Sequence, residues 1–262
     1  MMHRLFFLIL LLLFSLQMHA AETLHIAVIN LEPFLTDEGK GKTPGGIAVD
    51  YWRDYIAPRM NVSVKFSGPY PIRRAEYMLK NGEVDAVMHL TKIPEREKDF
   101  LFPETHLTGI KSCLVVPVDS SITKVLKTED MYGWTILFID SAYVPEMLLH
   151  RRINIEKVSG TDFRHIQLNM LLASRGEAML DINQVSLLFY LRNRGYLDRV
   201  RIITLPVKPQ KVYTIFSKTA KGMDLKRRFD KVNSKGLKKG VFERMTQDYL
   251  KRSGLANRNA VK

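Results

Sequence analysis

The fold is predicted most directly by residues 84–96, which read Val84-Asp-Ala-Val-Met-His-Leu-Thr-Lys-Ile-Pro-Glu-Arg96. The apolar run follows Asn81-Gly82, a pair that commonly ends a helix, and it is too short for a buried helix. It therefore predicts a short buried strand. Pro94 cannot continue a strand ladder but suits the first turn of a helix. Arg96 is thus expected in a turn or first helical turn, just past the carboxyl end of the strand.

Arg96 would lie where ligands collect in open α/β sheets, at the carboxyl ends of the strands. A guanidinium there offers a flat, permanently charged fork that matches a carboxylate or a phosphate. The sequence therefore predicts a binding site for an anionic group at this edge of the sheet.

The same stretch resembles the bacterial extracellular solute-binding proteins of family 3, the periplasmic receptors for amino acids and similar small molecules. The resemblance implies that Arg96 grips a ligand carboxylate and that Thr91 assists it. The family's threonine three residues before this arginine is Ile93 here, which removes one hydroxyl donor. The matching features are Gly82-Glu-Val-Asp-Ala86, the apolar run, Thr91, Pro94-Glu-Arg96 and the Phe-rich segment Glu97–Phe102.

The resemblance covers nearly the whole chain and implies a two-lobed α/β fold of the periplasmic-binding-protein (Venus flytrap) type, with two crossover hinge segments. A β-α-β rhythm in residues 118–204, after the break at Pro117, fits a second lobe with its own core. The expected division is a signal peptide (1–20), a first part of lobe 1 (22–110), lobe 2 (111–204) and a second part of lobe 1 with C-terminal helices (205–262).

Further ligand-binding candidates in lobe 1 come from the resemblance. The family's Pro-Phe loop carries an aromatic wall of the pocket, which implies a role for Phe34; the alternative is a loop phenylalanine packed on the core. Tyr70 and Arg74 match positions that deliver pocket residues in the family or a subgroup of it. A basic residue at a helix start opposes the helix dipole, but a surface ion pair of Arg74 with Glu76 or Glu83 would also explain it.

In lobe 2 we expect a buried strand at Thr135–Ile139, followed by a helix from Val144 to Arg151. Asp140 or Ser141 can cap such a helix. Its free N–H groups would form a binding site for an anion, and the resemblance places this site opposite Arg96. Capping without ligand contact is the alternative.

Residues Glu177–Asn183 form the counterpart, in lobe 2, of the motif around Asp85. In amino-acid-binding members an aspartate five residues after the acidic residue holds the ligand ammonium, a position taken here by Ile182. Asp181 is one residue short, and one residue on a strand decides which face a side chain occupies. Either the register shifts so that Asp181 or Asn183 serves, or the ammonium clamp is absent. Together with Ile93, this argues against a standard α-amino acid.

The N-terminus has the layout of a secretory signal: basic His3-Arg4, an apolar block Leu5–Phe14, and small residues near Ala20. The block is too short to cross a bilayer core of about 30 Å, although an uncleaved anchor is the alternative. No later window is apolar enough to cross a membrane, so we expect a soluble protein exported to the periplasm.

Composition excludes several classes of protein. The chain has 262 residues, 46% of them hydrophobic, and a net charge of +13. Export argues against nucleic acid as a partner, and the basic residues concentrate in the C-terminal helices, where a solvated face is expected. Cys113 has no partner for an internal disulfide and is expected to be buried. No Cys/His cluster has metal-ligand spacing, so we predict no metal and no cofactor.

The predicted function is capture of a small carboxylate-bearing ligand, an amino acid or a related compound, between two lobes. An inner-membrane permease of an ABC transporter, or a sensor domain, would read the closed form, and we expect a monomer. A sensory protein for a ligand other than an amino acid is one alternative. A dehydratase-like enzyme of the same fold is another, but its acid and base candidates Glu104, His89 and Asp181 form no recognisable pair.

Overall fold

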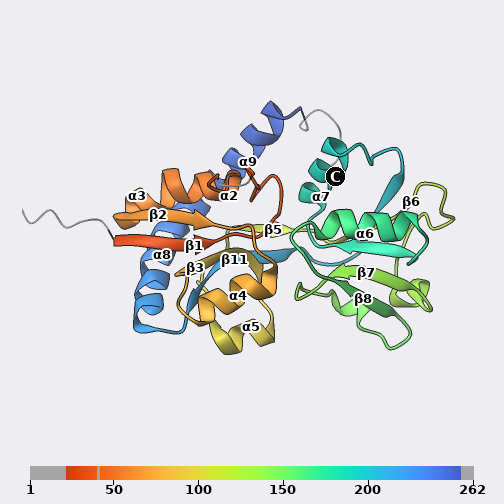
Figure 1. Ribbon diagram of the computed structural model, residues 1–262, viewed down its shortest axis with the longest axis horizontal. Coiled ribbons are helices and arrows are strands. Elements are labelled where there is room, and N and C mark those ends of the chain that lie inside the picture. The colour runs from red at the N-terminus through yellow and green to blue at the C-terminus, as the bar shows by residue number, and fades with distance from the viewer. Residues whose placement is uncertain (1–21, 40–41, 255–262) are drawn as a thin grey trace, which may run out of the picture.

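The computed structural model describes residues 22–39 and 42–254. They form two α/β lobes, each built around its own sheet (Figure 1). The predicted signal peptide, residues 1–20, lies outside the described residues. Within the part of the chain that is described, no helix has the length and apolar character needed to cross a membrane.

The sheet of lobe 1 has the strand order β2-β1-β3-β11-β4, with β5 also paired to β11. β1 runs parallel to β2 and β3, whereas β11 is antiparallel to β3. The predicted strand after Asn81-Gly82 is present as β3, and every residue of β3 is buried. The strands are β1 (Glu22–Ala27), β2 (Val62–Ser67), β3 (Ala86–Thr91), β4 (Phe100–Leu101), β5 (Thr108–Ile110) and β11 (Gln210–Ser217).

Helices cover both faces of this sheet (Figure 1). The helical segment that begins at Ile47 continues past Pro58 to Met60, because Pro58 occupies the first turn of α3, where a missing N–H costs little. Asn61 then ends it in a left-handed conformation. The helical segments are α2 (Ile47–Asp50), the π-helical η1 (Tyr51–Ile56), α3 (Ala57–Met60), α4 (Ile72–Lys80), α5 (Pro94–Asp99), α8 (Ala220–Lys238) and α9 (Val241–Arg252).

The sheet of lobe 2 has the order β10-β6-β9-β7-β8. Its two faces bury separate apolar clusters, and Cys113 is fully buried in one of them, as predicted. The elements are β6 (Cys113–Pro117), β7 (Thr135–Ile139), β8 (Asn154–Val158), β9 (Ala178–Asp181), β10 (Val200–Thr204), α6 (Phe163–Leu172), α7 (Gln184–Asn193) and the 3-10 turns η2 (Thr128–Met131) and η3 (Glu146–Leu148).

The helix predicted from Val144 to Arg151 is wrong. The segment forms only the short 3-10 turn η3, and Pro145 stands immediately before it in an extended conformation. Proline lacks an N–H and disfavours the helical conformation of the residue before it, so Val144 cannot begin a regular helix. The apolar spacing of the segment reflects packing on lobe 2 rather than an α-helix.

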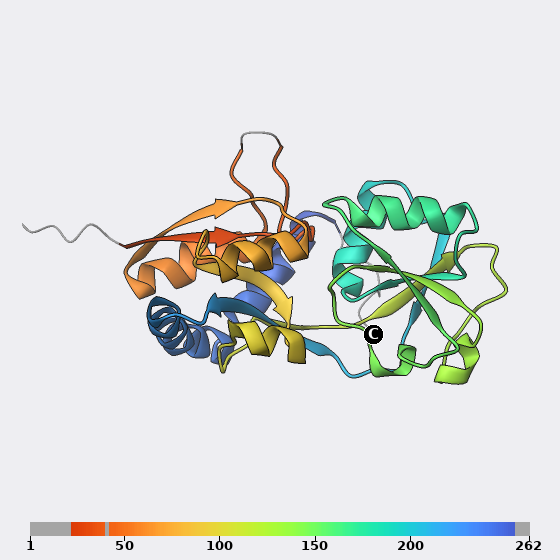
Figure 2. The same ribbon diagram turned by 60° about the horizontal axis from the view of Figure 1, so that its bottom comes forward.

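The chain passes from lobe 1 to lobe 2 between β5 and β6 and returns between β10 and β11. Figure 2 shows the two connections side by side, in yellow-green and blue. β5 pairs with the start of β11 on the lobe 1 side, while β6 pairs with β10 on the lobe 2 side. Two adjacent short connections of this kind form a natural hinge between the lobes.

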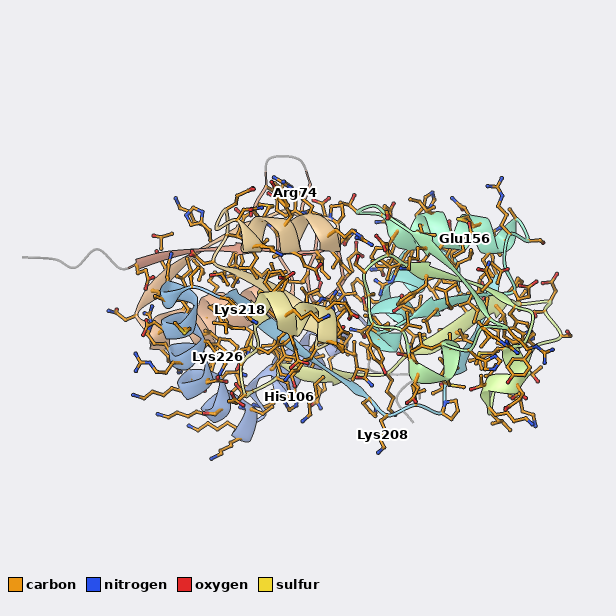
Figure 3. All side chains as sticks on the ribbon, turned by 90° about the horizontal axis from the view of Figure 1, so that it is seen from below. Arg74, His106, Glu156, Lys208, Lys218 and Lys226 are labelled. Atoms are coloured by element: carbon orange, nitrogen blue, oxygen red, sulfur yellow. The ribbon has the colours of Figure 1, made fainter. Side chains whose placement is uncertain are left out.

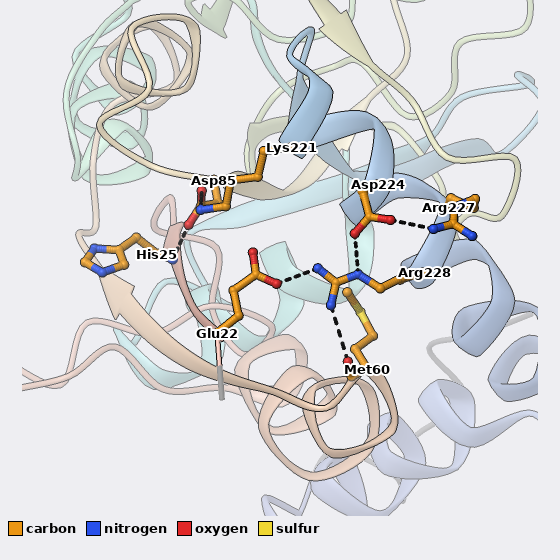
Figure 4. A network of polar contacts seen from close by, with 8 residues as sticks. All are labelled: Glu22, His25, Met60, Asp85, Lys221, Asp224, Arg227 and Arg228. Carbon is orange, nitrogen blue, oxygen red and sulfur yellow. Dashed lines mark hydrogen bonds and ion pairs between the residues drawn. The ribbon is translucent and has the colours of Figure 1, made fainter. Parts of the chain in front are cut away.

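The long helix α8 is fixed to the rest of lobe 1 by ion pairs (Figure 4). Arg228 contacts both Glu22 at the start of β1 and Asp224 within the helix. Lys221 pairs with Asp85, whose other carboxylate oxygen accepts from the backbone N–H of His25. The outer face of α8 projects its basic side chains into solvent (Figure 3), which agrees with the solvated face expected from the sequence.

Asn233 of α8 is the polar centre of the lobe 1 core. Its side-chain oxygen accepts from the Tyr51 hydroxyl (2.8 Å), and its nitrogen donates to the Thr105 hydroxyl (2.9 Å) and to the backbone oxygen of His106 (3.0 Å). The residue is 1% exposed. A buried amide with every partner in place connects η1, α8 and the loop before β5.

We expect Asn233→Ala to lower the free energy of unfolding by about 2–3 kcal/mol, because it leaves the buried Tyr51 hydroxyl and the His106 carbonyl without a partner. Urea denaturation followed by circular dichroism measures this change. The neighbouring half-buried Ser234 offers a control, since Ser234→Ala should stay within about 0.5 kcal/mol of the parent. Equal midpoints for the two variants would contradict this role of Asn233.

Candidate ligand-binding cleft

A cavity of about 30 Å³ lies between the two lobes. Lobe 1 contributes the segment after β1, the start of α4 and the end of β3, and lobe 2 contributes the end of β7, the start of α6 and the end of β9. The volume holds about two water molecules. The lobes are therefore closed over this cavity, and a solute much larger than water fits there only if they separate.

Arg96 lies at the lobe 1 side of this cavity and is 3% exposed. Pro94 begins α5, and the first turn of this helix returns the arginine side chain toward the end of β3. Its Nε donates to Glu76 (2.6 Å), and its Nη1 donates to both the backbone oxygen (2.9 Å) and the hydroxyl (3.0 Å) of Thr91. Its Nη2 donates to the backbone oxygen of Ser141 in lobe 2. The guanidinium therefore touches both lobes.

Further polar contacts cross the cleft. Arg73 of α4 forms a two-pronged ion pair with Asp140 at the end of β7, with one contact at 3.1 Å. This contact holds the pKa of the Asp140 carboxyl below its ordinary value. Asn30 donates to the backbone oxygen of Thr161 (3.3 Å), and the Ser186 hydroxyl donates to the backbone oxygen of Glu32. The closed arrangement is held by direct contacts between the lobes.

Asp181 lies at the lobe 2 side of the cavity, but its carboxylate is already bound. Arg164 of α6 donates from Nε to Oδ2 (2.7 Å) and from Nη2 to Oδ1 (3.2 Å). The backbone N–H of Asn183 donates to the same Oδ1 (2.8 Å). Both side chains of the ion pair are less than 5% exposed. A buried pair of this kind resists separation, because an unpaired buried charge is costly.

The structure brings four of the seven residues predicted to bind ligand into the cavity lining: Arg96, Thr91, Tyr70 and Asp181. Phe34 is buried behind His89, with their rings stacked at 4.9 Å. Arg74 pairs with Glu83 on the outer side of α4, as in the alternative interpretation, and Figure 3 shows it on that surface. The backbone oxygen of Ser141 accepts a hydrogen bond from Arg96. The predicted anion-binding site at Ser141 is wrong, because no α-helix begins there.

From the sequence, His89 is a candidate only as an acid or base of an enzyme, but the structure places it in the lining of the cleft cavity. It lies on β3 in a left-handed conformation (φ 65°), it is 3% exposed, and it lines the cavity. Neither ring nitrogen has a hydrogen-bond partner among the residues that the structure describes, and burial lowers the pKa of the imidazole to about 3. The histidine is therefore neutral at ordinary pH, with one donor and one acceptor unused. A histidine inside a predicted strand was the only signal in the sequence.

Glu76 and Arg164 were also not identified as partners of the cleft residues. Glu76 stands on α4 and its partner Arg96 on α5, while Arg164 stands on α6 and its partner Asp181 on β9. How these elements are rotated against one another cannot be read from spacing alone. Of the three acid and base candidates considered for an enzyme, His89 and Asp181 line the cavity, whereas Glu104 pairs with Lys226 at the surface. No cluster of three or more potential metal ligands occurs within residues 22–39 and 42–254.

The model of the bacterial extracellular solute-binding proteins, family 3, matches residues 24–252. The chain belongs to this family. The resemblance stated from the residues around Arg96 is thereby confirmed, and the family is one of binding proteins. No curated protein matched the sequence.

Solved structures confirm the two-lobed periplasmic-binding-protein fold. An arginine transport periplasmic binding protein from Legionella pneumophila has a TM-score of 0.72 and 20% identity, covering 87% of this chain and 100% of its own. A Streptococcus pneumoniae amino acid ABC transporter substrate-binding protein bound to L-arginine has a TM-score of 0.70, 18% identity and coverage of 87% and 94%. A histidine kinase sensor domain has a TM-score of 0.72, 18% identity and coverage of 88% and 97%.

The buried His89 predicts a specific loss of stability in acid. The unfolded chain binds a proton on this histidine near pH 6.5, whereas the folded protein does so only near pH 3. Unfolding is therefore favoured as pH falls below 6.5, by up to about 1.4 kcal/mol per pH unit. Between pH 7.5 and 5.0 the parent should lose about 2 kcal/mol more than His89→Asn, a variant that tolerates the left-handed conformation.

Urea denaturation at both pH values measures this difference. The exposed His25 supplies the control, because His25→Asn should keep the pH dependence of the parent protein. An identical pH dependence in the parent and in His89→Asn would show that His89 titrates normally and is not buried as described.

Proposed function

We propose that the protein is a solute-binding receptor that captures a small carboxylate-bearing ligand between its lobes, with Arg96 binding the carboxylate and Thr91 beside it. The observation that carries the proposal is the guanidinium itself. It is buried at the lobe 1 side of the cleft, and its Nη2 donates to the backbone oxygen of Ser141 in lobe 2. Glu76 and Thr91 compensate this charge within lobe 1, but the side that faces lobe 2 meets only an uncharged carbonyl, so this side can bind an anion when the lobes separate.

The hydrogen bonds of Arg96 define where a ligand carboxylate would bind. Nε and Nη1 are occupied by Glu76 and Thr91 within lobe 1, whereas Nη2 donates only to Ser141 across the cleft. When the lobes separate, both N–H groups of Nη2 become free. A ligand carboxylate can then accept from Nη2 and from the Thr91 hydroxyl, whose proton is not used by Arg96.

Binding would act through the equilibrium between open and closed forms. The cross-cleft contacts of Ser141, Asp140 and Thr161 stabilise closure without a ligand. Because the cavity of this closed form holds about two water molecules, a ligand would be enclosed by lobes that have closed less far, and it favours that arrangement only if it binds it more tightly than the open one. The two short connections between β5 and β6 and between β10 and β11 would absorb the motion.

We propose two candidates for the protein that recognises the ligand-bound form. The signal-like N-terminus and the family description support an exported, periplasmic protein that delivers its ligand to an inner-membrane ABC permease, acting as a monomer. The likeness to a histidine kinase sensor domain, together with closure by direct contacts between the lobes, supports a sensory role as the second candidate. Loss of uptake of the ligand on deletion of the gene would favour transport, and intact uptake would favour sensing.

Thermal-shift screening against amino acids, organic acids and opines should identify ligands through a saturable rise in Tm, equivalent to about 2.7 kcal/mol at a hundredfold excess over Kd. We expect Arg96→Met to raise the Kd of any such carboxylate at least about tenfold, because a hydrogen-bonded charge pair is lost. Calorimetric titration measures this change, and recovery of unchanged ligand would distinguish binding from enzymatic turnover.

A substitution of Glu76, the ion-pair partner of Arg96, provides a matched variant for Arg96→Met. Glu76→Gln keeps a hydrogen-bond acceptor for Nε but removes the competing negative charge, so it should lower the Kd several-fold. The double variant Glu76→Gln with Arg96→Met controls for the unpaired carboxylate that Arg96→Met leaves behind, and it should bind as weakly as Arg96→Met alone. Unchanged affinity in both Arg96 variants would contradict the proposed role of the guanidinium.

A further inference from the structure

The charges that line the cleft cavity are unevenly compensated. Two guanidiniums, Arg96 and Arg164, line the cavity, and Asp181 is the single carboxylate among the described residues that does so. Glu76, the partner of Arg96, lies outside that lining. Glu76 compensates Arg96 from the Nε side, whereas the Nη2 side of the guanidinium donates only to the uncharged Ser141 carbonyl. Arg96 can therefore still bind a carboxylate when the lobes separate, while the Asp181 carboxylate is fully paired with Arg164.

A ligand ammonium would find no partner there. Asp181 already accepts two hydrogen bonds from Arg164 and one from the backbone of Asn183. An ammonium enclosed between the lobes would lose its water without gaining a free carboxylate, which is unfavourable. The cleft therefore disfavours a zwitterionic α-amino acid, even though its carboxylate could reach Arg96.

His89 offers a hydrogen-bonding group that an uncharged ligand oxygen could use. Buried polar side-chain atoms almost always have a hydrogen-bond partner, yet both imidazole nitrogens of His89 have none while the ring lines the cavity. The ring is held by stacking on Phe34, and its backbone adopts a left-handed conformation that few non-glycine residues take. A neutral imidazole fixed in this way can donate to or accept from an un-ionised oxygen.

The remaining lining is aliphatic. Side chains from both lobes surround the space between His89 and Arg96 and would bury the carbon skeleton of a ligand. They include Ile29, Leu31, Ile72, Ile110, Ile139 and Ile182.

We propose that the cleft selects an aliphatic monocarboxylate that carries a hydroxyl or keto oxygen in place of an ammonium, with His89 hydrogen-bonded to that oxygen. This inference rests on the proposed function, because it takes the carboxylate to be bound by Arg96. It adds the class of ligand and a residue that determines specificity.

Four acids that share one skeleton test the proposal: 2-hydroxy-4-methylpentanoate, 2-oxo-4-methylpentanoate, leucine and 4-methylpentanoate. Each is titrated calorimetrically into the chain lacking residues 1–20, after unfolding and refolding to remove any bound solute. The hydroxy or the oxo acid should bind at least about tenfold more tightly than both leucine and 4-methylpentanoate. Leucine binding as tightly as the better of the two would overturn the proposal.

Two substitutions of His89 test whether its side chain forms a hydrogen bond with the ligand oxygen. His89→Phe keeps the stacking on Phe34 but cannot form hydrogen bonds, so it should weaken binding of the oxygenated acid about tenfold and leave 4-methylpentanoate unchanged. His89→Asn retains a hydrogen-bonding group and should recover part of the loss. His25→Asn, on the exposed side of β1, should bind like the parent protein.

The outcomes separate the two proposals. Unchanged discrimination in His89→Phe would mean that a water molecule, and not the ligand, satisfies the imidazole, and it would overturn the inference. If none of the four acids binds while another carboxylate binds in a manner abolished by Arg96→Met, the inferred class of ligand is wrong but the proposed function stands. If Arg96→Met leaves binding of every acid unchanged, the proposed function itself fails.

Discussion

The cleft depends on a buried positive charge that the protein compensates from one side only. Arg96 is enclosed at the floor of the cleft, where Glu76 balances its charge and Thr91 fixes its orientation. Because a buried guanidinium is tolerated only with such partners, the site is built before any ligand arrives. The side of the guanidinium that faces lobe 2 is bound only by the Ser141 carbonyl, an uncharged group that leaves when the lobes separate.

Closure of the cleft is held by contacts of unequal strength. The pair between Arg73 and Asp140 is partly solvated, since the Arg73 side chain is 69% exposed, and such pairs contribute little to stability. The contact between Arg96 and Ser141 is enclosed and therefore less screened by water. Closure consequently depends in part on the same guanidinium that is proposed to bind the ligand, which couples ligand capture to the position of the lobes.

Much of the fold could be predicted because its signals are local. Asn81-Gly82, the apolar run to Leu90 and Pro94 are neighbours in the chain, and together they place Arg96 past the end of β3. The helix expected at Val144–Arg151 is absent because Pro145, the second residue of that segment, prevents a regular helix from beginning at Val144.

The partners of the cleft residues could not be predicted, because they depend on packing between elements. Asp181 was recognised as one residue out of register with the family's ammonium clamp, but its pairing with Arg164 depends on how α6 is rotated against β9. Likewise, Phe34 was expected in the pocket wall, while the structure places His89 between it and the cavity. The left-handed backbone of His89 has no signature in the surrounding residues.

A crystal structure of the protein with a ligand found by screening tests the central claim most directly, through the distances from the ligand carboxylate to the nitrogens of Arg96. The account predicts an oxygen of the ligand about 2.7–2.9 Å from Nη2, with the Ser141 carbonyl displaced from that nitrogen and Glu76 still on Nε. A carboxylate bound elsewhere, with Arg96 still donating to both Glu76 and Ser141, would contradict it.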